Sequence, residues 1–384
     1  MPDSTATVAP RLFQPLALRS LSLRNRIVVS PMCQYTAHEG MLNDWHLVHL
    51  GKFALGGAAL VFTEATAVQK RGRITHGCTG LWHDEQIAGH AAVAHFLRLH
   101  GAVPGIQLAH AGRKASTQRP WLGGAPLGAE DVARGDLPWE VVGPSAVAVG
   151  EGWPLPHALS VTEIQQVVED FAAATRRSLA AGYQAVELHG AHGYLIQSFL
   201  SPIGNKRNDA YGGDLKGRMR MALEVTEAVR GAWPDELPLF FRVSAIDRVD
   251  GGWTLDDTVV LARALKAQGV DVVDCSSGGI SGLVTAARVK RQAGDQVPFA
   301  ERVRQEAGTM TMAVGLITDP HQAEEILVRN QADLVALGRE LLADPNWPLH
   351  AATALGAGAE QAPWPQQYAW GLTARSRNAE LYRR

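Results

Sequence analysis

The amino-acid sequence predicts an α/β fold, a closed (β/α)8 barrel. Short apolar runs rich in β-branched residues alternate with segments of helical periodicity along the 384 residues. This alternation indicates parallel strands joined by right-handed crossovers. Eight such units follow one another without a linker. An open doubly wound sheet is the alternative fold, and the number of units favours the barrel because open sheets normally have fewer strands.

The strand-like runs span most of the chain. They lie at Arg26–Met32, Ala59–Glu64, Pro104–Ala109, Ala185–His189, Leu239–Ser244, Val270–Cys275, Met310–Val314 and Leu334–Gly338. Ahead of them, Leu12–Leu23 alternates loosely and predicts an N-terminal hairpin. Residues 1–10 show no pattern and are predicted to be a loose, disordered tail. We therefore expect one barrel domain over residues 11–384.

Capping residues indicate where the intervening helices begin. The run Ser160–Glu163 is a capping box ahead of an apolar stripe, and Thr254–Asp257 repeats the device. Asp84 precedes a third stripe of apolar residues and is predicted to cap that helix.

Two segments interrupt the alternation. Gln118–His157 is long and rich in glycine, proline and tryptophan, and long loops are usually either functional lids or disordered. Its tryptophans favour an ordered insertion that caps the site. The C-terminal extension Glu360–Arg384 holds Trp364, Tyr368 and Trp370. Aromatic residues in such an extension more often pack on their own barrel or on a partner subunit than bind substrate.

The composition excludes several classes of partner. Charged residues are 19% of the chain and the formal net charge is −2, which gives no indication of a nucleic-acid partner. No apolar run is long enough to cross a bilayer, and the first residues lack the pattern of a signal peptide. The three cysteines are far apart and have no CxxC spacing, so we expect a reducing, cytoplasmic location.

Polar and titratable residues gather where the predicted strands end. The stretch Val186–Tyr194 begins as an apolar strand and ends with His189, His192 and a tyrosine among glycines. In barrel enzymes the active site lies at the carboxyl ends of the strands. Two ordinary loop histidines and a zinc-binding pair are the alternatives that this stretch alone leaves open.

The ends of the last two strands favour an anion-binding site. Gly315 follows the seventh strand, and Gly338 and Arg339 follow the eighth, the place where many barrels hold a phosphate. A GxGxxG dinucleotide motif after a first strand is absent, so a mononucleotide phosphate is favoured. The zinc alternative becomes weaker, because the ends of strands one, seven and eight offer no further metal ligands and Arg242 of strand five would repel a metal.

Several motifs together resemble those of the Old Yellow Enzyme family of flavin-dependent ene-reductases. The resemblance covers about Leu12 to Trp370 and is carried by Ser30–Cys33, Gln107–Lys114, His189–Leu195, Ser201-Pro202, Asn208–Gly213 and Gly338-Arg339. Cysteine after Ser-Pro-Met makes the chain similar to the bacterial thermophilic-like branch, which includes xenobiotic reductases.

The resemblance implies a non-covalent FMN cofactor with NADPH or NADH as the reductant. It also implies which residues hold the flavin: Ser30, Pro31, Met32 and Cys33 line it, Ala65 and Gln107 contact the ring, Arg242 holds the pyrimidine edge, and Gly315, Gly338 and Arg339 hold the phosphate. Cys33 is implied to modulate the flavin potential, and a buried structural thiol is its alternative role.

The resemblance further implies the reaction. His189 and His192 bind the oxygen of an α,β-unsaturated carbonyl or nitro substrate, while hydride moves from flavin N5 to the β-carbon. Two preorganised N–H donors stabilise the charge that develops on that oxygen. Tyr194 matches the residue that protonates the α-carbon, and Tyr35 matches a tyrosine that touches the ligand. Metal-dependent hydrolysis and a non-catalytic flavin- or ligand-binding barrel are the alternative functions.

The C-terminus departs from the family pattern. Many relatives place an arginine directly after a tyrosine, where it reaches into a neighbouring subunit's site. Here Tyr368 is followed by Ala369 and Trp370, and Trp370 is expected to fill that space and touch substrate. We expect a homodimer, or a homotetramer built from dimers, that acts on small molecules.

Overall fold

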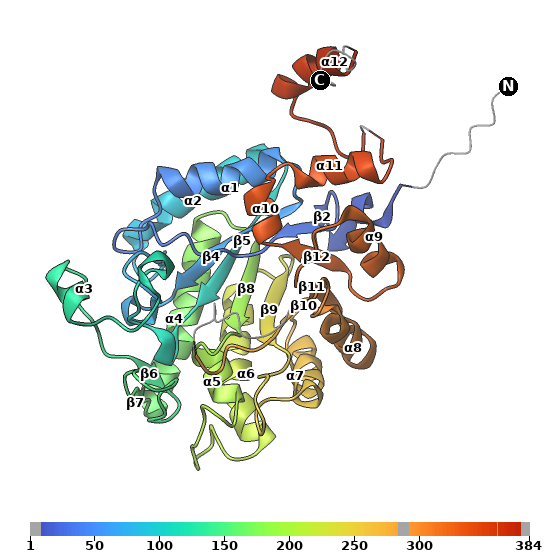
Figure 1. The fold of residues 1–384 in the computed structure, drawn as a ribbon. Helices are drawn as coiled ribbons and strands as arrows, with labels where there is room; N and C mark the ends of the chain where they lie inside the picture. The colour runs from blue at the N-terminus through green and yellow to red at the C-terminus, as the bar shows by residue number, and fades with distance from the viewer. Residues whose placement is uncertain (1–8, 283–291, 359, 378–384) are drawn as a thin grey trace.

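Eight parallel strands close into a barrel at the centre of the computed structural model, with helices around it (Figure 1). The structure describes residues 9–282, 292–358 and 360–377; residues 1–8 of the predicted tail and 378–384 of the extension lie outside them. Around the barrel the strands are β3 (Ile27–Val29), β4 (Leu60–Ala67), β5 (Val103–Ala109), β8 (Ala185–Gly190), β9 (Leu239–Ser244), β10 (Val272–Ser276), β11 (Met310–Ala313) and β12 (Leu334–Leu337). The predicted barrel is confirmed, and the open sheet is excluded because β12 pairs with β3.

Helices follow the strands and cover the outside of the barrel. The longer ones are α1 (Asp44–Leu55), α2 (Ile87–Leu99), α4 (Val161–Ala180), α6 (Leu215–Ala232), α7 (Leu255–Ala267), α8 (Val297–Ala307), α9 (Pro320–Val328), α11 (Trp347–Ala354) and α12 (Gln366–Arg377). Shorter helices are α3 (Ala129–Ala133), α5 (Leu195–Leu200) and α10 (Arg339–Ala343). The predicted capping boxes of α4 and α7 are present.

The predicted cap at Asp84 is wrong. Asp84 lies inside a 3-10 turn, Asp84–Gln86, and α2 begins after it at Ile87. The Asp84 carboxylate instead accepts a hydrogen bond from Arg177 of α4 at 2.7 Å. The Asp84 carboxylate, which the local sequence predicted to cap α2, is therefore used in a contact with a distant helix.

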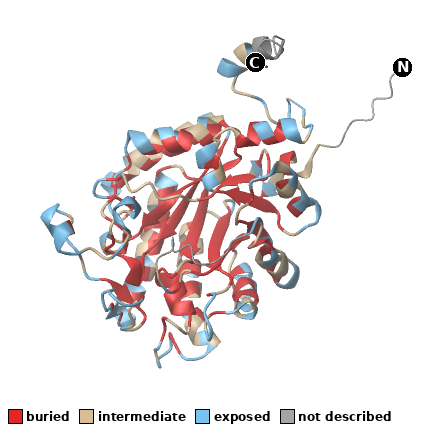
Figure 2. Ribbon diagram, in the orientation of Figure 1, coloured by how far each residue is buried: buried red, intermediate tan, exposed pale blue. Residues whose placement is uncertain are grey.

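The core has two layers, one between strands and helices and one inside the barrel. The strands are buried while the outer faces of the helices are exposed (Figure 2). Strands buried on both faces have continuous apolar sequences, as these do. Phe62, Phe240 and Val272 belong to the inner cluster, which also contains Leu18 and Leu23. The last two come from the predicted hairpin, β1 (Leu16–Leu18) and β2 (Leu21–Leu23), which thus closes one end of the barrel.

The first barrel strand is shorter than the sequence indicates. It ends at Val29, and the chain from Ser30 leaves the ladder. The Ser30 backbone N–H donates to the carbonyl of Leu337 at 2.9 Å. Farther along, the Gln34 N–H donates to the carboxylate of Glu64 at 2.8 Å. A side chain of β4 therefore replaces a strand neighbour and directs this loop across the end of the barrel.

The insertion at residues 118–157 is ordered by polar contacts. It contains α3 and a short parallel pair, β6 (Val142–Gly143) with β7 (His157–Ala158). Buried Asp131 accepts hydrogen bonds from the Gln118 amide and the Gly128 N–H, each at 2.9 Å. Trp139 donates to the carbonyl of Arg71 at 2.9 Å and lies 5.2 Å from the Arg73 guanidinium. The Asp131 bonds lie within the insertion, and the Trp139 contacts attach it to the loop after β4.

The C-terminal helix α12 lies apart from the barrel, beyond α11 (Figure 1). In the described part of the chain, none of the helices combines the length and the apolar character that crossing a membrane requires.

Replacing Ser160 with alanine should lower the free energy of unfolding by about 1 kcal/mol, the usual cost of losing an N-cap side chain. In the structure the Ser160 hydroxyl accepts from the Glu163 N–H at 3.3 Å, and the Glu163 carboxylate accepts from the Ser160 N–H at 2.8 Å. Chemical denaturation followed by circular dichroism measures the change. Thr162→Ala, at an exposed neighbouring position, is the control and should not destabilise the protein. Equal stability of both variants would contradict the role of the cap.

Candidate active site

Strand register brings polar residues from four strands to one level of the barrel. Gln107 of β5 is paired with Glu187 of β8. Two residues further along β8, His189 is paired with Arg242 of β9, and Arg242 is paired with Asp274 of β10. Side chains at paired positions of adjacent strands point to the same face. Residues far apart in sequence therefore form one polar layer beyond the apolar inner cluster.

This polar layer is buried and only partly hydrogen-bonded. The Gln107 side-chain Nε2 donates to Glu187 Oε1 at 2.7 Å. Arg242 Nε lies 3.1 Å from Asp274 Oδ2, close enough for an ion pair but without the geometry of a hydrogen bond. Arg242 Nε, Glu187 Oε2 and both Asp274 carboxylate oxygens have no hydrogen-bond partner among the described residues. Buried polar groups without partners are expensive, so this cluster indicates a ligand with complementary polar atoms.

Burial also sets the protonation of the two carboxyl groups. Desolvation raises the pKa of Glu187, and the nearby Asp274 raises it further. Desolvation likewise raises the pKa of Asp274, against the opposing effect of Arg242. The layer therefore carries less negative charge than two exposed carboxylates would.

The predicted phosphate and flavin-lining residues come together at the junction of β12 and β3. A Cβ atom placed on Gly338 would lie 3.6 Å from Met32 Sδ and 4.0 Å from the Ser30 side chain. Arg339 follows with an exposed side chain at the start of α10. Gly315, after β11, has a φ of +107°, which only glycine adopts readily. Ala65 is paired with Gln107 across β4 and β5, so it lies beside the polar layer.

The two predicted histidines contact each other at the end of β8. His189 Nδ1 accepts from the Ala191 N–H at 3.2 Å, which places the ring proton on Nε2. His189 Nε2 lies 3.4 Å from His192 Nδ1, and His192 Nε2 lies 2.8 Å from Ser276 Oγ. Burial, and then the charge of Arg242, hold the pKa of His189 well below its ordinary value. His189 is therefore a neutral imidazole with an N–H donor.

The backbone of His192 is fixed from two sides. Its φ is +60°, in the left-handed region that is uncommon for residues other than glycine. Its N–H donates to Ser244 Oγ at 3.0 Å, and its carbonyl accepts from Lys114 Nζ at 3.0 Å. Lys114 also contacts the carbonyl of Gly279. Burial, with a contribution from Arg113, lowers the pKa of Lys114 to about 7.

Tyr194, Tyr35 and Cys33 lie near the two histidines, and each keeps its proton at neutral pH. The Tyr194 ring lies 5.0 Å from the His189 ring, nearly perpendicular to it at 86°. Burial raises the pKa of Tyr194 well above its ordinary value, and Cys33 adds to the shift. Burial also raises the pKa of Tyr35. For the Cys33 thiol, burial raises the pKa first and the Glu64 carboxylate second, so Cys33 is a thiol at neutral pH.

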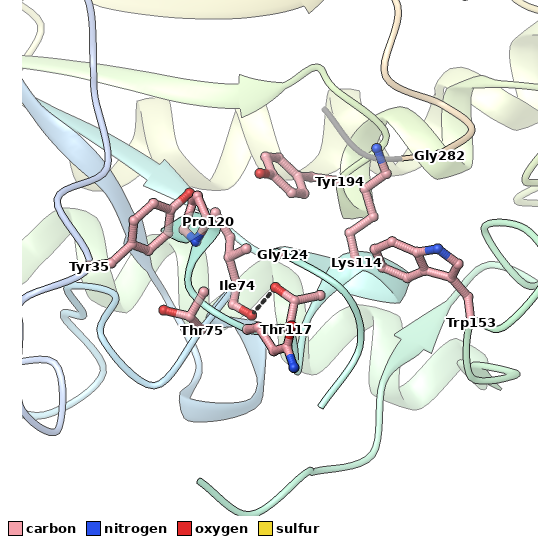
Figure 3. Close-up of a pocket in the computed structure, with 11 residues that line it drawn as sticks. Tyr35, Ile74, Thr75, Lys114, Thr117, Pro120, Gly124, Trp153, Tyr194 and Gly282 are labelled. Carbon is pink, nitrogen blue, oxygen red and sulfur yellow. Dashed lines mark hydrogen bonds between the residues drawn. The ribbon is translucent and has the colours of Figure 1, made fainter. Parts of the chain in front are cut away.

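A pocket of about 60 Å³ opens beside the two tyrosines (Figure 3). Tyr35 and Trp153 lie at opposite sides of it, with Tyr194 and Lys114 between them. The insertion contributes Gln118, Pro120, Gly124 and Trp153 to its wall.

The structure does not bring Trp370 to this pocket within one chain. Trp370 lies on α12, and 77% of its surface is exposed. Across residues 9–282, 292–358 and 360–377, no three His, Cys, Asp or Glu side chains converge as metal ligands.

Comparison with known proteins assigns the family. Residues 11–357 match the family described as NADH:flavin oxidoreductase / NADH oxidase. The chain belongs to this family. The resemblance to Old Yellow Enzymes drawn from the motifs is thereby confirmed, as are an NAD(P)H-dependent oxidoreductase activity and an FMN cofactor.

Individual relatives support this assignment. The chain is 43% identical to the NADPH dehydrogenase of Geobacillus thermodenitrificans (strain NG80-2) over 94% of this chain and 98% of that protein. Morphinone reductase has a solved structure with a TM-score of 0.75, 27% identity and 92% coverage of each chain. A complex of 2-naphthoyl-CoA reductase reaches a TM-score of 0.80 at 23% identity, and the match covers 90% of this chain but only 52% of that one; this likeness shows the fold alone.

The polar layer fits the flavin that the family binds. Arg242 Nε, which has no hydrogen-bond partner among the described residues, belongs to the same layer as the Gln107 amide, and Gln107 is paired with Ala65. The loop from Ser30 reaches β4 next to Ala65, through the bond of Gln34 to Glu64. A guanidinium and an amide are the groups that the carbonyl and N–H edge of an isoalloxazine requires.

Sequence reasoning missed Glu187, Ser276 and Lys114. An acidic residue within an apolar strand was the available signal for Glu187. Lys114 belongs to a motif that carried the family resemblance, but its contacts with His192 and Gly279 depend on how distant loops pack. Ser276 gave no local signal, since its role depends on the position of His192.

His110, at the end of β5, should make stability fall in acid. Burial lowers its pKa from 6.5 to about 3, so below pH 6.5 the unfolded chain takes up a proton that the folded protein does not. The stabilisation is complete above pH 6.5 and is lost progressively as the pH falls towards 3. In His110→Gln, the dependence of unfolding free energy on pH between 6 and 4 should decrease by about 1.4 kcal/mol per pH unit.

Glutamine is a suitable replacement because His110 accepts from the Gly112 N–H at 3.0 Å and contacts the Gln69 side chain at 3.0 Å, and an amide can do both. Denaturant titrations at several pH values measure the slope. Identical slopes for the two proteins would show that the folded and unfolded states bind the proton of His110 equally, so that burial does not lower its pKa.

Proposed function

We propose that this protein is an ene-reductase: NAD(P)H reduces its FMN, and the flavin then reduces the activated C=C bond of α,β-unsaturated carbonyl or nitro compounds. The observation that carries the proposal is the pair of imidazole rings 5.1 Å apart beside a buried, protonated Tyr194. Bound FMN supplies the hydride from N5. The protein supplies N–H donors that stabilise the negative charge on the substrate oxygen, and an acid that gives a proton to the α-carbon.

Binding of FMN is proposed to use three sets of residues. Gln107 and Arg242 hold the pyrimidine edge, where a cation stabilises the charge that the ring gains on reduction. The lining residues are Ser30, Pro31, Met32, Cys33 and Ala65, and the phosphate is held by Gly315, Gly338 and Arg339. The adjacency of Gly338 to Met32 supports this division, since it places the phosphate residues next to the lining loop.

His189 and His192 are proposed to hold the substrate oxygen. The Nε2–H of His189 and the Nδ1 of His192 lie 3.4 Å apart, so one oxygen between them can contact both nitrogens. His192 donates there when its proton is on Nδ1, and the Ser276 hydroxyl can then donate to Nε2 at 2.8 Å. Losing one such donor typically costs about 10²–10³ in rate.

Tyr194 is proposed as the acid that protonates the α-carbon. Its raised pKa keeps the proton on the phenol throughout the neutral range. Tyr194 lines the pocket together with Tyr35, which is proposed to touch the substrate. The two tyrosines therefore act as neutral donors on a partly apolar wall.

The proposed partners are small-molecule substrates and further copies of this chain, as a homodimer or a homotetramer built from dimers. Tyr368 and Trp370 of α12 are 48% and 77% exposed, which supports contact of this helix with a neighbouring subunit, where Trp370 is proposed to bind substrate. The three cysteines are free thiols, which supports the proposal of a reducing cytoplasm.

The two half-reactions test the proposal directly. The purified protein should be yellow, lose its visible absorbance when NADPH or NADH is added under nitrogen, and regain it when 2-cyclohexenone follows. Tyr194→Phe should slow reoxidation by the enone by about 10²-fold while leaving flavin reduction nearly unchanged, because only reoxidation needs the acid. Bound FMN that neither nicotinamide reduces would favour the non-catalytic barrel, and equal slowing of both steps would remove Tyr194 from its role.

Ser276→Ala should weaken binding of a phenol to the oxidised holoenzyme about tenfold, because His192 loses the hydroxyl that can donate to Nε2 when the ring proton is on Nδ1. Titration with 4-hydroxybenzaldehyde, followed by its long-wavelength charge-transfer band, measures the affinity. Ser277→Ala is the matched control, since Ser277 contacts Arg248 and Gln296 and not the histidine. Equal phenol affinity in both variants would exclude Ser276 as the positioning group.

A further inference from the structure

Glu187 is a buried acid to which the reaction gives no role. It is fully buried at the middle of β8, and none of its atoms forms an ion pair with a described residue. Arg242, the nearby cation, is already in an ion pair with Asp274 at 3.1 Å. The one hydrogen bond of the Glu187 side chain within the described residues is the contact with Gln107 at 2.7 Å. A buried carboxyl group is retained at a cost, so this contact is the place to look for its role.

The chemistry of the pair fixes the orientation of the glutamine. A carboxylate oxygen accepts hydrogen bonds, so the Gln107 side chain must present its NH2 group to Glu187 Oε1. The amide oxygen of Gln107 and its second N–H then point elsewhere. A proton taken up on Oε2, which has no partner, leaves Oε1 as the acceptor and does not change this orientation. Without Glu187 the amide would be free to turn over, because its two ends have the same shape.

We propose that Glu187 is a positioning residue for the cofactor. It holds the Gln107 amide with the oxygen facing the N3–H of the flavin and an N–H facing the neighbouring carbonyl. The inference rests on the placement of Gln107 at the pyrimidine edge in the proposed function. Strand register supports it, because Gln107 and Glu187 are direct partners across β5 and β8 and their side chains share one face.

The test compares two cofactors in reconstituted apoprotein. FMN and N3-methyl-FMN differ only in the hydrogen that the Gln107 oxygen would accept. The wild-type protein should bind FMN more tightly than N3-methyl-FMN, measured by quenching of flavin fluorescence. In Glu187→Leu the FMN affinity should fall about tenfold, and the preference for FMN should shrink by the same factor. In Glu187→Gln the preference should be kept, because the new amide oxygen still accepts from Gln107.

A double-mutant cycle shows whether Glu187 acts through Gln107. Gln107→Leu alone should remove the preference for FMN, and adding Glu187→Leu should change it no further. Thr63→Val is the control for a general packing defect: Thr63 is buried on β4 and bonds to Tyr183, away from this opening. This control should lower stability and leave the preference unchanged. Glu187→Met is the second apolar variant if Glu187→Leu does not fold.

The outcomes distinguish the contact of Gln107 with the flavin from the orientation of Gln107 by Glu187. If Gln107→Leu leaves both affinities unchanged, Gln107 does not contact the flavin and its placement in the proposed function is wrong. If Gln107→Leu removes the preference but neither apolar variant of Glu187 alters it, Glu187 does not orient the amide and this inference is overturned.

Discussion

The site depends on the hydrogen-bonded register of β8 with its two neighbours. Val186 and Leu188 belong to the apolar layer between strands and helices, so the residues between and after them, Glu187 and His189, face the inside of the barrel. A slip of one residue would exchange the two sets, because side chains alternate along a strand. Burial of two aliphatic side chains on the outside thus determines where the acid and the imidazole stand on the inside.

The same alternation divides the inside of the barrel into an apolar part and a polar part. On β9, Phe240 belongs to the inner apolar cluster, and Arg242, two residues later, belongs to the polar layer. On β10, Val272 and Asp274 are the corresponding partners. The polar side chains thus rest on a packed floor that leaves them few alternative positions. Several kcal/mol of desolvation per charged group can be tolerated there because the surrounding barrel is extensive and rigid.

Sequence patterns predict the barrel well because its strands are continuous apolar runs, and β9 was predicted at its observed bounds. They fail where a distant side chain competes with a local pattern. Ser30–Met32 has strand-like composition, but its continuation bonds to Glu64 rather than to a strand. The family motifs locate the residues at the strand ends, including both histidines. They do not reveal which neighbour orients each one, since Ser276 lies far from His192 in sequence and the two meet only after the barrel closes.

One physical cause, removal of water, prepares the histidine and the tyrosine for related tasks. Burial disfavours the charged form of each group, so it lowers the pKa of His189 and raises that of Tyr194. Both side chains are consequently neutral and carry a hydrogen that they can donate. A protonated imidazole would give a stronger hydrogen bond, but it would place a second cation beside Arg242, which itself contributes to lowering the His189 pKa. With neutral donors and the single cation Arg242, the site can stabilise negative charge that develops on the substrate during the reaction. It does so without holding a second positive charge before the reaction begins.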